Sequence, residues 1–242
     1  MANEEDKMLG IIGAMTEEVL HLKESMENVE IRTIATMDFY QGKLCGLDVV
    51  VVRSGIGKVN AAICSQILID QYHVTRIINT GIAGSLRSKI DIGDIVLSRD
   101  ALQHDVDATG FGYKVGEIPQ MEESIFKADR TLIYMADMCC REVIPMVGVH
   151  VGRVVSGDQF VSDKAKKGWL IKNFQGYCTE MEGAAIAQTA HLNGVPFLII
   201  RAISDKADDS AEMDYSEFEA MAIENSVKLV KAIAEKLVGF DK

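Results

Sequence analysis

Short apolar runs alternate with segments of helical period along the chain, and this alternation constrains the fold more than any other feature. It predicts strands at residues 7–15, 37–44, 47–55, 76–84, 94–102, 147–155, near 177 and at 195–204. It predicts helices at residues 16–26, 58–71, 129–142, 164–173, 183–194 and 216–238. Because Cys45 and Gly46 join the second and third strands closely, these two should form an antiparallel hairpin. The pattern therefore predicts an α/β fold, with a mixed, twisted β-sheet flanked by helices on both faces.

The length of the chain favours one domain. Its 242 residues, 48% of them hydrophobic, can bury a substantial core, and no repeat, low-complexity stretch or linker divides them. We therefore expect a single domain over residues 1–242, with residues 1–6 as a flexible tail.

The net charge and the first residues argue against nucleic-acid partners, membrane partners and export. A formal charge of −11 and a sequence pI near 4.9 leave no basic stripe to neutralise phosphates, so we expect no nucleic-acid partner. An uncharged or zwitterionic small ligand fits this composition better. The N-terminal MANEED is acidic and polar, and the apolar runs are too short for a bilayer. We expect a soluble protein that is not exported and has no membrane partner.

The cysteines and histidines predict neither disulfides nor a metal site. The five cysteines are odd in number and scattered, without a CxxC spacing, and reduced thiols in the cytoplasm explain them most simply. The five histidines show no HExxH or other helical pair of ligands. We therefore expect no metal and no cofactor.

One long segment, residues 104–120, has three glycines, two aromatic residues and no helical period. In a compact domain such a segment is usually a functional or interface loop. We take it as the leading candidate for an interface.

The ends of the predicted strands carry the residues most informative about function. Ligands of α/β sheets collect at the carboxyl ends of strands, which here fall at residues 13–18, 54–58, 179–185 and 201–208. These segments combine glycine and small residues with carboxylates that have few cations near them in sequence. This favours acid/base chemistry and recognition of hydroxyl groups over phosphate binding.

The glycine turn at residues 54–58 is not a nucleotide-binding loop. A Walker A motif would need Gly at Val52 and Ser or Thr at Val59, and a dinucleotide fingerprint would need a third Gly at Asn60. A tight turn from strand to helix is the simpler interpretation.

Six segments, in this order and spacing, carry a family resemblance: GIIGAMTEEV, SGIGKVNAA, INTGIAGS, VSGDQF, TEMEGAAIA and RAISDKAD. Together they are similar to the signature segments of the 5'-methylthioadenosine/S-adenosylhomocysteine nucleosidases, members of the nucleoside phosphorylase superfamily. The resemblance runs from about Met8 to the last helix. It implies a nucleoside phosphorylase-like fold and hydrolysis of the N-glycosidic bond of both nucleosides, which releases adenine.

The resemblance implies two catalytic residues. Glu18 would activate the water, and Asp205, after Ser204, would act as the general acid at N7 of the purine. From the residues alone, Glu18 could instead be a first-turn acid of a helix. Ser204 and Asp205 could instead be a helix cap followed by solvated charges at Lys206, Asp208 and Asp209.

Further residues would bind substrate. Glu182 would bind the 2' and 3' hydroxyls of the ribose, while Met181 packs against the sugar or simply fills the core. Glu180 is also expected to line the site, and the resemblance assigns it no specific role. The ring of Phe160 would stack on adenine and the backbone at Phe160 and Val161 would read its edge. The remaining substrate-binding candidates are Met15, Ile56 and Tyr215 near the 5' group, Ile82, and Phe111, Tyr113 and Pro119 from a neighbouring subunit.

Because Phe111, Tyr113 and Pro119 would come from a neighbouring subunit, the resemblance predicts a homodimer.

Ile82 departs from the family's pattern in the segment TGIAGS, because relatives often have Ser there, and the departure leaves substrate preference open. Asp158 is more plausibly structural.

Three other functions are alternatives to hydrolysis of methylthioadenosine and S-adenosylhomocysteine. Phosphorylases of the superfamily share TEMEGAA and RAISD but bind phosphate with arginines and a serine, whereas this chain has Asn79 and Ile82 at two such places. A related nucleosidase that cleaves aminofutalosine would differ in its 5' pocket. A nucleoside-binding protein that has lost catalysis would keep the fold alone.

Overall fold

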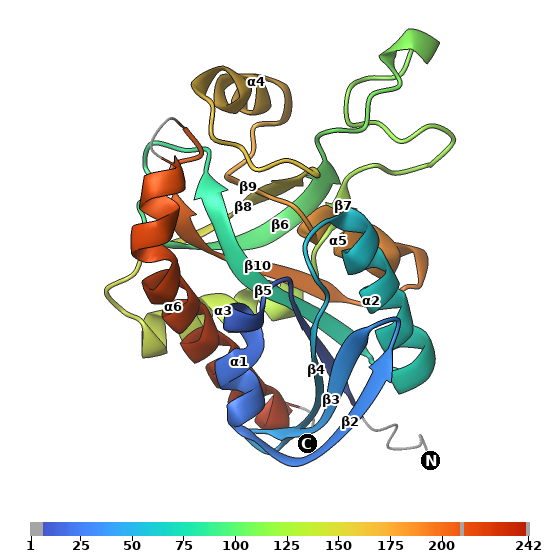
Figure 1. The fold of residues 1–242 in the computed structure, drawn as a ribbon, viewed down its shortest axis with the longest axis vertical. Helices are drawn as coiled ribbons and strands as arrows, with labels where there is room; N and C mark the ends of the chain where they lie inside the picture. The colour runs from blue at the N-terminus through green and yellow to red at the C-terminus, as the bar shows by residue number, and fades with distance from the viewer. Residues whose placement is uncertain (1–6, 209–210, 241–242) are drawn as a thin grey trace.

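The computed structural model describes residues 7–208 and 211–240, apart from the side chains of residues 212 and 216 (Figure 1). The expected tail at residues 1–6, and Asp209, lie outside the described residues. The strands are β1 (Leu9–Gly13), β2 (Met26–Ile34), β3 (Met37–Leu44), β4 (Leu47–Arg53), β5 (Arg76–Ser85), β6 (Ile95–Gln103), β7 (Phe126–Lys127), β8 (Val149–Ser156), β9 (Cys178–Glu180) and β10 (Phe197–Asp205). The helices are α1 (Thr16–Glu24), α2 (Lys58–Tyr72), α3 (Arg130–Val143), α4 (Lys164–Phe174), α5 (Gly183–Leu192) and α6 (Ala211–Phe240), with a 3-10 turn η1 (Thr109–Phe111).

The strands form one mixed sheet, which confirms the predicted α/β class. Its order is β10-β6-β8-β9-β5-β1-β4-β3-β2, with β7 beside β6. Parallel pairs include β1 with β4 and β5, and β6 with β8, while β3 and β4 form the predicted antiparallel hairpin. The parallel central strands β1 and β5 are buried along nearly their whole length, as expected for strands covered on both faces.

One part of the sheet closes on itself, which the sequence did not indicate. Strand β10 pairs with β5 on one side and with β6 on the other, and β6, β8 and β9 lead back to β5. These five strands therefore form a closed ring, whereas β1, β4, β3 and β2 extend from it as an open sheet. Closure is a common outcome for a large twisted sheet, because its accumulated twist brings distant strands together.

Helices pack on both faces of the sheet (Figure 1). Helix α6 packs against β10, β5, α1 and α3, while α2 and α5 pack against each other on the opposite side. Helix α4 covers a second, smaller apolar cluster that includes Leu102, Val155, Leu170 and Phe174. None of the helices within the described residues is long and apolar enough to cross a membrane.

Three elements differ from the prediction, and one of them is the two-residue strand β7, which is too short to leave a pattern in the sequence. Strand β2 was missed because MENVEIRTI is largely exposed at the edge of the sheet and has no clear apolar alternation. Helix α6 begins at Ala211, five residues before the predicted start at Ser216. Residues 104–120 form a loop as predicted, with only the short η1 turn inside it, and the loop projects from the body of the molecule (Figure 1).

Candidate active site

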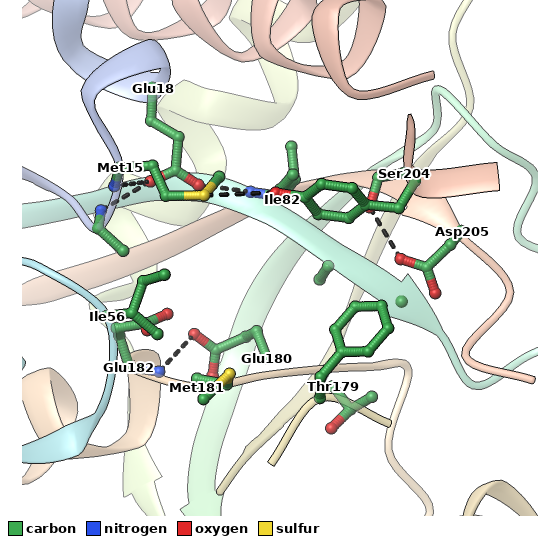
Figure 2. A pocket seen from close by; sticks show the side chains of 15 residues that line it. Met15, Glu18, Ile56, Ile82, Thr179, Glu180, Met181, Glu182, Ser204 and Asp205 are labelled. Atoms are coloured by element: carbon green, nitrogen blue, oxygen red, sulfur yellow. Dashed lines mark hydrogen bonds between the residues drawn. The ribbon is translucent and has the colours of Figure 1, made fainter. Parts of the chain in front are cut away.

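The candidate site lies where the sheet divides along β5. On one edge of β5, residues 76–79 pair with β1 and residues 84–85 pair with β9, so residues 80–83 have no strand partner on that edge within the described chain. A cavity of about 580 Å³ opens at this division. Its size suits a small-molecule ligand. Figure 2 shows Glu18, Glu182 and Asp205 arranged around it.

The fold brings together most of the residues singled out in the sequence. The predicted residues that line the cavity are Met15, Glu18, Ile56, Ile82, Phe160, Glu180, Met181, Glu182, Ser204, Asp205 and Tyr215. They come from segments up to 200 positions apart, as the hydrogen bond between Tyr215 and Met15 illustrates. The lining also contains Ala14, Ala83, Gly84 and Thr179, which the sequence did not single out.

Glu18 is held by the backbone from three directions. Its Oε2 accepts hydrogen bonds from the amides of Ala14 at 2.6 Å and Met15 at 3.0 Å. Its Oε1 accepts from the amide of Ile82 at 3.2 Å, on the edge of β5 that no strand covers. Burial raises the pKa of Glu18, and the charge of Arg201 and these amide bonds offset that rise only in part. Glu18 therefore stabilises the start of α1, as a first-turn acid does, and also presents a buried carboxyl group to the cavity.

Asp205 ends strand β10 and is almost wholly buried. Its Oδ2 accepts from the Ser204 hydroxyl at 2.9 Å and its Oδ1 accepts from the Ala207 amide at 2.7 Å. Burial raises the pKa of Asp205 more than these bonds lower it, which favours the protonated form that a general acid needs. The interpretation of Ser204 and Asp205 as a helix cap is wrong, because the next helix begins only at Ala211.

The two glutamates of TEMEGAA differ in their surroundings. Oε1 of Glu182 accepts from the Gly57 amide at 2.8 Å, and burial together with the charge of Glu180 raises the pKa of Glu182 to about 8. Burial acts against ionisation of Glu180 as well, but Arg201 and the Ser156 hydroxyl outweigh it and lower its pKa. Glu180 is thus an ionised partner of Arg201, whereas burial and the charge of Glu180 favour the protonated form of Glu182.

Arg201 is the important residue that sequence reasoning missed. It is fully buried, and its Nη2 donates to Glu180 and, at 2.5 Å, to Oδ1 of Asn79. Nη1 donates to the carbonyl of Ile200 at 3.0 Å. A lone arginine inside the apolar run FLIIRAIS was an available signal, because a buried cation needs a carboxylate partner.

An aromatic pair, Phe160 and Tyr215, forms part of the cavity lining. The rings of Phe160 and Tyr215 meet edge to face, with centroids 6.0 Å apart. The Tyr215 hydroxyl lies 3.0 Å from Oε1 of Glu219 and 3.3 Å from Sδ of Met15. Phe160 remains 49% exposed, so its face is available to a flat ligand.

The remaining predicted residues do not line the cavity of this chain. The side chain of Val161 packs into the apolar cluster beneath α4, with Leu170 and Phe174. Phe111, at 87% exposure, Tyr113 and Pro119 lie on the projecting loop. Asp158 has a structural contact, because its Oδ1 accepts from the Lys58 amide at 2.8 Å. Within the described residues, no group of three His, Cys, Asp or Glu side chains is arranged to hold a metal ion.

Comparison with known proteins gives a consistent family. Residues 8–235 match the model of the phosphorylase superfamily. The chain is 46% identical over 231 residues to a 5'-methylthioadenosine/S-adenosylhomocysteine nucleosidase of Halalkalibacterium halodurans, covering 95% of this chain and 98% of that protein.

Solved structures agree with this similarity. A nucleosidase of the same name from Neisseria meningitidis, in complex with methylthio-immucillin-A, superposes with a TM-score of 0.91 at 40% identity, covering 95% of this chain and 99% of that one. A futalosine hydrolase of Helicobacter pylori superposes with a TM-score of 0.90 at 30% identity, covering 96% of this chain and 98% of that one. The fold is thus shared by enzymes that are named for different substrates.

Proposed function

The chain belongs to the phosphorylase superfamily, and from this membership we propose that it is a 5'-methylthioadenosine/S-adenosylhomocysteine nucleosidase. It uses water to break the bond between adenine and the 5'-thio-substituted ribose. Relatives at 38–46% identity over 95% of the chain carry that activity in their names. A futalosine hydrolase has the same fold, so the assay below compares substrates with different 5' groups.

The charge of the cavity lining supports water, and not phosphate, as the nucleophile. The lining contains four carboxyl groups, from Glu18, Glu180, Glu182 and Asp205, and no Lys, Arg or His among the described residues. The buried Arg201 does not line the cavity, and Glu180 already neutralises it. A phosphate ion would meet the carboxylate of Glu18, ionised as the base requires, without a free cation in the lining, whereas water carries no such penalty.

The chemical step follows from two of these carboxyl groups. Glu18 takes a proton from water as the water oxygen bonds to C1' of the ribose. The C1'–N9 bond breaks, its electron pair passes into the purine, and Asp205 supplies a proton at N7. The raised pKa of Asp205 supports its role as the acid. The backbone amides that hold Glu18 support a fixed position for the base.

Glu182 and Met181 suit the ribose. In its protonated form, which burial favours, Glu182 can donate one hydrogen bond to a ribose hydroxyl and accept another, whereas the carboxylate form would accept both. Met181 lines the cavity and can pack against the sugar, so the alternative role as core filler is less favoured.

The two ends of the cavity suit adenine and a thioether. Phe160 can stack on the base while its backbone and that of Val161 read the edge of the purine. Met15, Ile56, Ile82 and Tyr215 provide a largely apolar wall for the 5' group.

A homodimer would complete the 5' end with Phe111, Tyr113 and Pro119 of the neighbour. Val59 at 70%, Ile63 at 42% and Phe111 at 87% exposure support an apolar contact surface formed by α2 and the 104–120 loop. The five cysteines are all free, which supports a cytoplasmic location.

One parallel assay tests the proposal. Purified protein is incubated with methylthioadenosine, S-adenosylhomocysteine, 5'-deoxyadenosine and aminofutalosine, with and without phosphate. The adenine released from each substrate is measured. We expect adenine from the first two substrates at a rate that phosphate does not change. A requirement for phosphate would make the protein a phosphorylase, and exclusive cleavage of aminofutalosine would reassign the 5' pocket. Nucleoside binding without any cleavage would leave a binding protein.

A further inference from the structure

Three segments around the cavity are joined by a ring of hydrogen bonds that the chemistry above does not use. Nζ of Lys58 donates to Oδ1 of Asp105 at 2.6 Å and to Oε1 of Gln103 at 2.9 Å. Oδ2 of Asp105 accepts from the Asp158 amide at 3.0 Å. Oδ1 of Asp158 in turn accepts from the Lys58 amide at 2.8 Å, which closes the ring.

Each member of the ring belongs to a different functional segment. Lys58 follows Gly57, whose amide donates to Glu182. Asp158 precedes Phe160, which lines the cavity. Asp105 stands at the start of the 104–120 loop. The ring therefore ties together the ribose contact, the segment that carries the aromatic ring, and the loop proposed to reach a neighbouring subunit.

The position of the ring in the sheet explains why a connection is needed there. Strands β6 and β8 run side by side until their last pair, Gln103 with Ser156, and their following loops then separate. Gly157 lies so close to the His104 ring that a Cβ there would be 2.3 Å from Cε1. Asp105 directly follows His104, and its hydrogen bond with the Asp158 amide connects the two loops just beyond the last strand pair.

We propose that Asp105 is a positioning residue for the hydrolysis, acting through Lys58 and Asp158 on the substrate-binding residues Glu182 and Phe160. This inference rests on the proposed nucleosidase function. Lys58 and Asp105 are only 18% and 19% exposed, so solvent weakens their ion pair less than it weakens a surface pair. The pair touches neither Glu18 nor Asp205, and its loss should therefore affect substrate binding more than the chemical step.

A double-mutant cycle tests this assignment. Asp105→Asn keeps the size of the side chain but turns an amide toward Lys58, and Lys58→Met removes the ammonium while keeping the backbone amide. We expect each variant to raise KM for methylthioadenosine about tenfold, with kcat changed less than about twofold and the pH profile of kcat unchanged. Because both changes remove the same contact, the double variant should be no worse than the weaker-binding single variant.

The matched control is Lys43→Met. Lys43 pairs with Asp48 at 2.8 Å, but this pair is 43% and 47% exposed and lies on the β3–β4 hairpin. We expect its KM to equal that of the unaltered protein. Equal effects in Lys43→Met, unchanged KM in both single variants, or effects of the two single variants that multiply in the double variant would each overturn the proposal.

A binding measurement separates this inference from the proposed function. The dissociation constant for adenine, measured by calorimetry on the full chain, should rise in Asp105→Asn and Lys58→Met but not in Lys43→Met. If the unaltered protein releases no adenine from methylthioadenosine yet shows this order of affinities, the nucleosidase assignment fails and the positioning role stands. Equal affinities in all variants would overturn the positioning role, whatever the activity.

Discussion

Gly81→Ala should disable the enzyme by moving Glu18, although the new methyl group touches no substrate. Gly81 lies on β5 at the edge where the cavity opens. A Cβ at this position would lie 2.5 Å from Oε1 of Glu18, 3.1 Å from its Cδ and 3.3 Å from Nη1 of Arg201. Gly81 is not among the residues with positive φ, so the variant tests this contact and not backbone strain.

The size of the effect follows from these distances. Ordinary contact begins at 3.4 Å, so the carboxyl group must retreat by about 0.9 Å from 2.5 Å. The Ile82 amide donates to the same oxygen at 3.2 Å, and a retreat of this size would stretch that bond beyond hydrogen-bonding distance. A misplacement on the order of 1 Å can lower a rate by about 100-fold, which equals about 3 kcal/mol in activation free energy.

Single-turnover release of adenine from methylthioadenosine measures the chemical step directly. We expect Gly81→Ala to lower this rate by about 100-fold, while adenine still binds. The matched control is Gly168→Ala on α4, where a Cβ meets no atom within 4 Å, and it should react at the unaltered rate. A thermal melt of each variant separates misfolding from misplacement. A folded Gly81→Ala protein with full activity would refute the role of Glu18 as a base fixed beside this glycine.

Further predictions concern the carboxyl groups themselves. Glu18→Gln and Asp205→Asn should each lower kcat by about 10²- to 10⁴-fold with adenine binding retained, and full activity in either would exclude that residue from the mechanism. Glu182→Ala should weaken binding of methylthioadenosine more than of its 2'-deoxy analogue, and an equal loss would assign the hydroxyls to another residue. Burial raises the folded-state pKa of Glu182 to about 8 from the ordinary glutamate value of 4.5, so the native protein binds more protons than the unfolded chain between these values. Its contribution to stability is complete below pH 4.5 and is lost as pH rises toward 8, by roughly 1 kcal/mol per pH unit. Glu182→Gln removes this loss. The free energy of unfolding, measured in urea, should therefore exceed that of the unaltered protein by an amount that grows from pH 5 to pH 8. A difference in unfolding free energy that stays constant with pH would contradict the raised pKa.

Local pattern was sufficient to predict most elements of the fold, but it could not predict how distant strands pair. The apolar runs at β1, β5 and β10 are visible in the sequence because parallel, buried strands are apolar on both faces. Strand β2 is visible only through its pairing with β3, since its own residues are mostly exposed. The closure of the ring depends on β10 pairing with β5, more than 110 positions away, and no local signal specifies that contact.

The candidate site shows the same limit. Motifs at strand ends identified Glu18, Glu182 and Asp205, and the fold places all three around one cavity. The same motifs indicated nothing about protonation, because the raised pKa of Glu182 depends on a buried neighbour, Glu180. They also passed over Arg201, whose place in an apolar run was a signal in the sequence but whose three acidic neighbours are identified only in the fold.

Arg201 explains how closely placed carboxyl groups can have different protonation states. One buried cation interacts with Glu180, Glu182 and Glu18, but among these three carboxyl groups it donates a hydrogen bond only to Glu180. Glu180 is therefore ionised, while burial dominates at Glu18 and Glu182 and raises the pKa of both. Such a division of pKa values is how one site assigns different roles to similar groups. A sugar that gains positive charge as adenine leaves would then meet carboxyl oxygens, while the nearby buried Arg201 is already neutralised by Glu180. In the proposed hydrolysis this arrangement would stabilise an oxocarbenium-like transition state and offer an incoming anion no free cation, so the same charge pattern would favour both bond cleavage and water as the nucleophile.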